Sequence, residues 1–310
     1  MLNYNHIMEE TMKYAISIDI GGTNTRVSLI DENYDVKGFE TFRTDSQEPY
    51  NTLNMIKTII ESYDKDVVGV GVSCPGPLDL KAGIILTPPN LPGWHGLHFT
   101  EVMTEMLGIP TYLENDGNLA CLAEAVLGAG KDMRFVQYLT ISTGLGAGFV
   151  IDKEIYQGSG GYAQEVANVI VVPNGHAVGD LQPGSVESIS SGTGIVSMAR
   201  SKGLDVAHAG IVNDLANEGN EVAMGVMRDA KTYLANFIAG IYAFLDPEIV
   251  ILGGSVALKI EGFVEDVETI VRNKVYPVIA PKVRVEKSTI GEDNGILGGA
   301  ILAFRKAGRI

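Results

Sequence analysis

One pattern constrains this chain more than any other: an apolar strand, a bare glycine turn and a second apolar strand. In AISIDIGGTNTRVSLID, residues 15–31, apolar residues alternate up to Asp19, two glycines and small polar residues follow, and the alternation resumes until Asp31. Alternation of this kind is typical of a β-strand with one buried face. The segment therefore predicts a β-hairpin with a carboxylate beside a glycine turn.

The same pattern returns later in the chain. YLTISTGLGAGFVID, residues 138–152, is again strand, glycine turn and strand, and Asp152 lies 121 positions after Asp31. A chain of 310 residues is long enough for two domains of roughly 150 residues each. The repeated hairpin therefore predicts two domains that begin in the same way.

Between and after these hairpins, short apolar runs alternate with segments of helical periodicity, which predicts an α/β fold. Strands are expected at 14–20, 26–31, 37–42, 67–74, 109–116, 138–142, 146–151, 248–253 and 283–290. Helices are expected at 51–63, 99–108, 117–130, 221–246 and 294–308, with Gly108 as a C-cap and Pro247 as a stop.

Composition narrows the functional classes. Hydrophobic residues make up 45% and charged residues 20%, which is typical of a globular protein, and the net charge of -15 argues against binding to nucleic acid. No apolar run reaches the length of a membrane span, and residues 1–11 read as a loose extension and not as a secretory signal. We therefore expect a cytoplasmic protein, with Cys74 and Cys121 as buried free thiols.

Three glycine-rich turns follow apolar strands, at 21–24 (GGTN), 143–148 (TGLGAG) and 253–255 (GGS). None matches the P-loop, and none is expected to open a helix inside a β-α-β unit as a dinucleotide fingerprint does. Glycines let backbone N–H groups point at one ligand, which is how many proteins hold phosphates. Any single turn is also compatible with a plain hairpin, but three of them favour a phosphate site.

Four segments, in this order, resemble the ROK family of sugar kinases, which belongs to the actin/hexokinase-like ATPases: DIGGTNTRVSLID, YLENDGNLACLAEAVLGAG, TISTGLGAGFV and VILGGSV. The resemblance runs through nearly the whole chain from Met12. It implies two actin/hexokinase-like (ribonuclease H-like) α/β lobes that flank a central cleft. The first would comprise 12–127 with the C-terminal helix 296–310, and the second 128–295.

By this resemblance the cofactors are ATP and Mg²⁺. The residues implied for ATP are Gly21, Gly22, Thr23, Asn24, Thr143, Gly144, Gly146, Gly253 and Gly254. Asp19 would hold the Mg²⁺, directly or through water. The assignment is chemically reasonable because Mg²⁺ keeps most of its waters, and because phosphoryl transfer depends on charge neutralisation and alignment.

The resemblance also implies a sugar site. Asp116 would be the general base that takes the proton from the attacking hydroxyl, whereas without the family context it reads as a helix N-cap. The residues implied for sugar binding are Gly76, Asn90, Asn115, Asp116, Glu165 and Asn168. Amides and carboxylates suit this role because they pair with neighbouring hydroxyls.

The chain departs from the family pattern at one point. In many members, the glutamate that corresponds to Glu165 is followed by Gly-His and then by a cysteine-rich loop that binds structural zinc. Here Asn168 stands in place of that histidine, no cysteine follows Cys121, and His176 is expected to be a solvated loop residue. A tetrahedral zinc site needs several nitrogen or sulfur ligands, so we expect no structural zinc.

The resulting hypothesis is ATP-dependent phosphorylation of a sugar hydroxyl, most readily the 6-hydroxyl of glucose or a related hexose, by a homodimer. N-acetylmannosamine and β-glucosides are alternative substrates. A sugar-sensing transcriptional regulator is disfavoured because only eighteen residues precede Asp19, which leaves no helix-turn-helix. An inactive sugar-binding module is disfavoured because Asp19, the glycine turns and Asp116 are all present.

Overall fold

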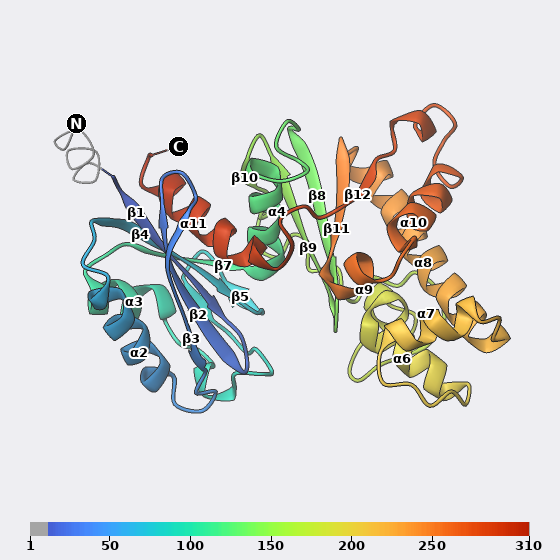
Figure 1. The fold of residues 1–310 in the computed structure, drawn as a ribbon, viewed down its shortest axis with the longest axis horizontal. Helices are drawn as coiled ribbons and strands as arrows, with labels where there is room; N and C mark the ends of the chain where they lie inside the picture. The colour runs from blue at the N-terminus through green and yellow to red at the C-terminus, as the bar shows by residue number, and fades with distance from the viewer. Residues whose placement is uncertain (1–11, 310) are drawn as a thin grey trace. The chain divides into compact units, whose positions relative to one another are not determined.

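A computed structural model describes residues 12–309 (Figure 1). Over these residues the chain forms two compact units, each with its own sheet and core. Unit 1 comprises 12–123, 158–161 and 293–309, and unit 2 comprises 124–157 and 162–292. The extension expected at the N-terminus lies outside the described residues. In the part of the chain that the structure describes, no helix has the length and apolarity to span a bilayer.

Unit 1 is built on a five-stranded sheet in the order β3-β2-β1-β4-β7. Its strands are β1 (Tyr14–Ile20), β2 (Asn24–Asp31), β3 (Val36–Arg43), β4 (Val67–Cys74) and β7 (Thr111–Asn115). Short turns make β1, β2 and β3 antiparallel, whereas longer connections containing helices make β1, β4 and β7 parallel. The three parallel strands therefore end at one edge of the sheet.

Helices cover both faces of this sheet: α2 (Pro49–Ser62) and α3 (Phe99–Leu107) pack on one face, and α11 (Asn294–Lys306) packs on the other (Figure 1). Helix α4 (Asp116–Val126) follows β7, and a small hairpin pairs β5 (Leu78–Asp79) with β6 (Ile84–Ile85). The red helix α11 lies against β1 and β4 (Figure 1). The helix and strand approach so closely that a Cβ on Gly71 would lie 1.9 Å from the carbonyl oxygen of Gly299. Only a glycine therefore fits at position 71. The chain passes from unit 1 to unit 2 within α4.

Unit 2 repeats the sheet, in the order β10-β9-β8-β11-β12. Its strands are β8 (Phe135–Ile141), β9 (Leu145–Ile151), β10 (Glu154–Ile155), β11 (Ile249–Gly253) and β12 (Val285–Lys287). The directions match those of unit 1: β8, β9 and β10 are antiparallel neighbours, and β8, β11 and β12 are parallel. Both units therefore open with the same hairpin, and the α/β prediction is confirmed.

The core of unit 2 is built around one long helix. Its helices are α5 (Val186–Ser190), α6 (Gly192–Ser201), α7 (Ala209–Asn217), α8 (Glu221–Leu245), α9 (Gly254–Lys259) and α10 (Phe263–Arg272). At the start of α8 the Asn220 side chain accepts a hydrogen bond from the Ala223 N–H, and the helix ends at Leu245, with Asp246 as a C-cap whose φ is 44°. Pro247 follows directly, so the predicted stop is confirmed.

Most predicted strands and helices are present within a few residues of their expected bounds. The sequence analysis missed α5, α6, α7, α9 and α10. One prediction was wrong: the turn at 253–254 does open a helix, α9, between the parallel strands β11 and β12. That helix has six residues, which is too short to show a helical period in the sequence. Cys74 and Cys121 are buried and form no disulfide, as predicted.

Candidate functional site

The carboxyl ends of the parallel strands in unit 1 bring together residues that are far apart in the sequence. Asp19 lies opposite Ser73 in the β1–β4 register, and Cys74 lies opposite Asn115 in the β4–β7 register. Asp116 follows Asn115 directly. Ligands of open α/β sheets usually bind at this edge. The structure therefore collects Asp19, Asn115 and Asp116 where a ligand would be expected.

Asp19 is paired with an arginine. Arg26 lies opposite Asp19 across the β1–β2 hairpin, and its Nε and Nη2 donate to Asp19 Oδ2 at 3.0 and 2.5 Å. The two side chains keep 20% (Asp19) and 36% (Arg26) of their surface exposed. This pair was not predicted, although residues equally distant from a hairpin turn face each other across the strands.

The first glycine turn packs against another predicted site residue. The Gly21 N–H donates to the carbonyl oxygen of Asn24 at 2.9 Å, which closes the turn. A Cβ on Gly22 would lie 2.7 Å from the Cβ of Asn90, so a side chain at position 22 would collide with Asn90. Thr23 and Asn24 are exposed. The turn and Asn90 therefore form one continuous surface in unit 1.

Asn115 and Asp116 share the start of α4. The Gly117 N–H donates to Asn115 Oδ1 and to Asp116 Oδ1, both at 2.8 Å. Asn115 therefore supplies an N-cap to α4, a role that had been considered only for Asp116. Asp116 keeps exposed surface although protein atoms crowd around it. Desolvation by these atoms raises its pKa, and the charge of Asp19 adds to the rise, while the Gly117 N–H opposes it. A raised pKa suits a general base working near neutral pH.

In unit 2, a carboxylate from another element holds the second glycine turn. The Leu145 N–H donates to Glu187 Oε2, from α5, at 2.7 Å, and the Ser142 N–H donates to the carbonyl oxygen of Gly144 at 3.0 Å. A Cβ on Gly144 would lie 2.9 Å from Glu187 Oε2. A side chain at position 144 would therefore push the Glu187 carboxylate aside. The sequence analysis did not link Glu187 to the turn, because 42 positions separate it from Leu145.

The second and third glycine turns meet at a cavity of about 700 Å³ within unit 2. Thr143 lines it from one turn, and Ser255 lines it from the other. Gly254 has a φ of 80°, and a Cβ on it would lie 2.4 Å from the carbonyl oxygen of Ile141 at the end of β8. Gly253 precedes it, and Gly146 is the second residue of β9, opposite Thr140 of β8. The structure thus brings the two predicted turns of unit 2 to one cavity.

The rest of that cavity wall was not predicted. Its polar and charged residues come from α6, α7 and α9 and from the residue before α7: Thr193, Arg200, His208, Asp214 and Lys259. All five are exposed. The cavity therefore offers hydrogen-bond donors and positive charge beside two glycine turns, a combination that suits a phosphorylated ligand.

The predicted sugar residues of unit 2 lie in the loop after β10. Glu165 is exposed and closes a turn, in which its N–H donates to the carbonyl oxygen of Tyr162 at 3.3 Å. Asn168 Oδ1 accepts a hydrogen bond from the Gln182 N–H at 2.9 Å, so the oxygen of this side chain serves the loop itself. Gly76, by contrast, lies in unit 1, two residues after the end of β4.

The loop from Asn168 to Glu187 is tied back on itself by hydrogen bonds. The Gly184 N–H donates to the carbonyl oxygen of His176 at 2.8 Å. The expectation of a solvated His176 was wrong: the residue is partly buried, its Nε2 lies 2.8 Å from Ser197 Oγ, and burial lowers its pKa. Within residues 12–309, no three His, Cys, Asp or Glu side chains are grouped as metal ligands.

Two sets of predicted site residues thus result, one in each unit. The unit 1 set is Asp19, Gly21, Gly22, Thr23, Asn24, Gly76, Asn90, Asn115 and Asp116. The unit 2 set is Thr143, Gly144, Gly146, Glu165, Asn168, Gly253 and Gly254.

The family model described as "ROK family" matches residues 15–306, and the chain belongs to this family. A glucokinase from Thermotoga maritima is 29% identical over 94% of this chain and 98% of its own length. An N-acetylmannosamine kinase from Salmonella heidelberg is 31% identical over 93% of this chain and 98% of its own. A ROK glucokinase from Streptomyces griseus, solved with glucose and AMPPNP, is 26% identical with a TM-score of 0.76, covering 94% of this chain and 99% of its own. The fold is thus the actin/hexokinase-like fold of ROK kinases.

Proposed function

We propose that this protein is a sugar kinase that transfers a phosphoryl group from ATP to the 6-hydroxyl of glucose or a related hexose. The relatives that match along nearly their whole length are named as kinases of glucose and N-acetylmannosamine. The observation that carries the proposal is Asp116, an accessible carboxylate with a raised pKa at the carboxyl edge of the unit 1 sheet, near Asp19.

On the acceptor side, Asp116 takes the proton from the attacking hydroxyl as that oxygen approaches the phosphorus. Asn115 is held beside it because its Oδ1 caps α4, which leaves its amide N–H groups as donors. Asn90, Glu165 and the backbone at Gly76 complete the proposed hydroxyl contacts. Asn168 contributes its amide N–H groups, since its oxygen accepts the Gln182 N–H within the loop.

On the donor side, the first turn offers backbone N–H groups to the phosphates, and the cavity between the second and third turns receives the rest of the nucleotide. Asp19 is the proposed ligand of Mg²⁺. A single carboxylate fits this ion, which keeps several waters and otherwise binds phosphate oxygens. Bound Mg²⁺ supplies charge neutralisation during transfer. Arg26 holds the Asp19 side chain in place and balances its charge.

N-acetylmannosamine is the second candidate substrate, because the identity to a kinase of that sugar, 31%, matches the identity to a glucokinase, 29%. β-Glucosides remain a third alternative. We propose in addition a cytoplasmic homodimer without structural zinc and without affinity for nucleic acid, a prediction that rests on the family resemblance, the charge of -15 and the loop without cysteine.

The test is a coupled ADP-release assay with Mg²⁺-ATP across hexoses, N-acetylhexosamines and β-glucosides. Sugar-dependent ADP release with one preferred sugar is the expected result. Turnover of N-acetylmannosamine at a kcat/KM above that of glucose would replace the first substrate with the second. Tight sugar binding without any ADP release would leave an inactive sugar-binding protein.

A further inference from the structure

The turn that carries Glu165 contains a residue in a conformation that side chains seldom adopt. Tyr162 to Glu165 form a β-turn closed by the Glu165 N–H, which donates to the Tyr162 carbonyl oxygen at 3.3 Å. Gln164 occupies the third position with a φ of 75°. A positive φ at this position is the signature of a type II turn, which favours glycine or asparagine. A glutamine there must be held by something other than its own backbone preference.

A buried amide holds it. Gln137 of β8 is fully buried, and its Nε2 donates to Gln164 Oε1 at 2.8 Å. The same Nε2 lies 2.9 Å from the Gly148 carbonyl oxygen and 3.1 Å from that of Tyr138. These two carbonyl oxygens require a donor, so they decide which end of the Gln137 amide is nitrogen. Gln164 must therefore present its oxygen to the sheet.

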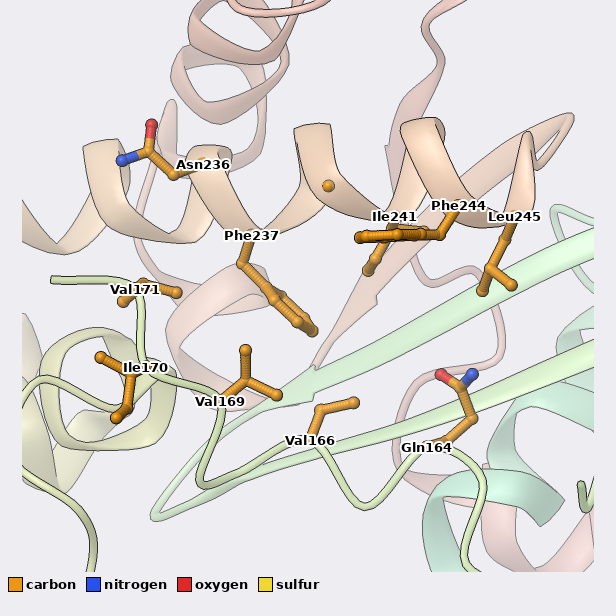
Figure 2. Close-up of a pocket in the computed structure, with 11 residues that line it drawn as sticks. Gln164, Val166, Val169, Ile170, Val171, Asn236, Phe237, Ile241, Phe244 and Leu245 are labelled. Atoms are coloured by element: carbon orange, nitrogen blue, oxygen red, sulfur yellow. The ribbon is translucent and has the colours of Figure 1, made fainter.

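The other side of Glu165 is held as well. The Val166 N–H donates to the carbonyl oxygen of Gln164 at 2.8 Å, which makes Glu165 the centre of a three-residue turn. Val166 packs against the core of unit 2. Figure 2 shows Gln164 and Val166 on one loop facing α8, where both line an apolar cavity of about 500 Å³. Glu165 is thus the exposed residue between two neighbours that are each anchored to the unit.

We propose that the Gln137–Gln164 amide pair is a positioning device for Glu165. It keeps the turn in the one conformation that presents the Glu165 carboxylate to the sugar, although neither glutamine contacts substrate. The inference rests on the proposed function insofar as Glu165 is taken to bind sugar hydroxyls. The Gln137 side chain acts from inside the sheet, so the position of a substrate contact depends on a residue that no ligand touches.

The test compares Q164A, Q164G and Q137M with the wild type, using the sugar that the wild type phosphorylates best. Q164A removes the hydrogen bond between the two side-chain amides. Q164G also removes it but places at position 164 a residue that readily adopts the positive φ. N174A is the matched control, because Asn174 is exposed, has a φ of 55° in the same unit and is not part of the amide pair. Two readouts are needed: hydrogen exchange of the Glu165 and Val166 amides, and the KM for sugar separately from kcat and from the KM for ATP.

We expect the two amides to exchange about tenfold faster in Q164A, Q164G and Q137M, as loss of one hydrogen bond allows. The KM for sugar should rise about five- to tenfold with kcat within about threefold and the KM for ATP unchanged, because a misplaced contact weakens binding. N174A should change neither readout. Wild-type exchange and KM in Q164G, or a lowered Tm with both readouts unchanged in Q164A and Q137M, would overturn the proposal.

E165Q separates this inference from the proposed function. If E165Q leaves the KM for sugar unchanged while the three glutamine variants speed exchange, the amide pair orders the turn but Glu165 is not a sugar contact. In that case the positioning role fails because the proposed function is wrong about Glu165. If E165Q raises the KM for sugar and the glutamine variants do not, the positioning role fails on its own.

Discussion

The hairpins that open the two units share one topology but hold their carboxylates in different ways. In unit 1 Asp19 stands on the strand itself, and Arg26 faces it across the hairpin. In unit 2 the same position of β8 is Thr140, opposite Gly146, and the carboxylate at the turn is Glu187 from α5. Both sheets therefore have a carboxylate near the glycine turn of their opening hairpin. The sequence of each unit decides whether a strand or a helix supplies it.

The last strand of each sheet shows the same divergence. Asp116 follows β7, and Ser288 follows β12 at the equivalent position. Ser288 Oγ donates to the buried Glu124 at 2.5 Å, so the residue in unit 2 secures a loop. Asp116 in unit 1 keeps exposed surface. The equivalent strand ends therefore differ: the residue in unit 2 secures a loop, and the residue in unit 1 is the proposed general base.

The largest expected effect tests this division directly. D116N should lower kcat by about 10²–10⁴ with little change in Tm, because an amide cannot accept the proton. S288A should keep kcat and lower the free energy of unfolding by about 1 kcal/mol, since Glu124 retains backbone donors at Thr289 and Ile290. Steady-state kinetics and thermal unfolding measure both. A kcat loss in S288A as large as in D116N would break the comparison.

The pH profile of the wild type sharpens the same point. Desolvation raises the pKa of Asp116, so the base is ionised above that raised value and becomes protonated as the pH falls through it. We expect the acidic limb of log kcat/KM against pH to lie above the ordinary aspartate value of about 4. A limb at or below that value would mean that Asp116 is not the titrating base.

The second effect concerns the two hairpins. D19N should lower kcat/KM by roughly 10- to 100-fold and raise the Mg²⁺ concentration needed for half-maximal rate, because it removes a charge that the proposed metal site needs. T140V, at the equivalent position of unit 2, should stay within about threefold of wild type, since only a hydroxyl is lost. Kinetics at varied Mg²⁺ decide the matter, and an equal loss in both variants would contradict it.

A third, smaller effect separates the two Ile-Asp repeats. Asp31 is buried, and its Oδ1 accepts N–H groups of Asn33 and Asp35 at 2.9 and 3.0 Å, so D31A should lower the free energy of unfolding by about 2 kcal/mol. Asp152 is exposed and pairs with Arg134, so D152A should leave Tm nearly unchanged. Chemical denaturation measures the difference. Equal losses would show that the repeated acids have equivalent roles.

The smallest expected effect is that of zinc removal on the loop from Asn168 to Glu187 in unit 2, a loop without a counterpart in the described residues of unit 1. A zinc-selective chelator with excess Mg²⁺ should change neither activity nor Tm, and metal analysis of untagged protein should find well under one zinc per chain. The loop is held by hydrogen bonds such as the one between His176 and Ser197 instead. Zinc that survives dialysis in equal amount with the chain would contradict this prediction.

Much of the fold could be predicted because its signals are local. Alternation at period two marked β1, β2, β8 and β9, and glycines marked the turns between them. Helices α5 and α9 were missed because five or six residues carry too little periodicity. Helix α10 does carry a helical period, at Phe263, Val267 and Val271, and could have been predicted. The site followed the same rule: Asp19 and Asp116 belong to motifs, whereas the Arg26 partner of Asp19 follows only from strand register.

The sequence by itself determined the α/β class, the two glycine-turn hairpins and the family, because each depends on residues that are close together along the chain. Only the tertiary structure decided that Glu187 reaches the second turn, that Asn168 serves its own loop, and that Gln137 holds Gln164. These contacts join positions 14 to 42 residues apart. Hydrogen bonds form between whatever groups packing brings within about 3 Å, and no spacing rule along the sequence encodes that distance.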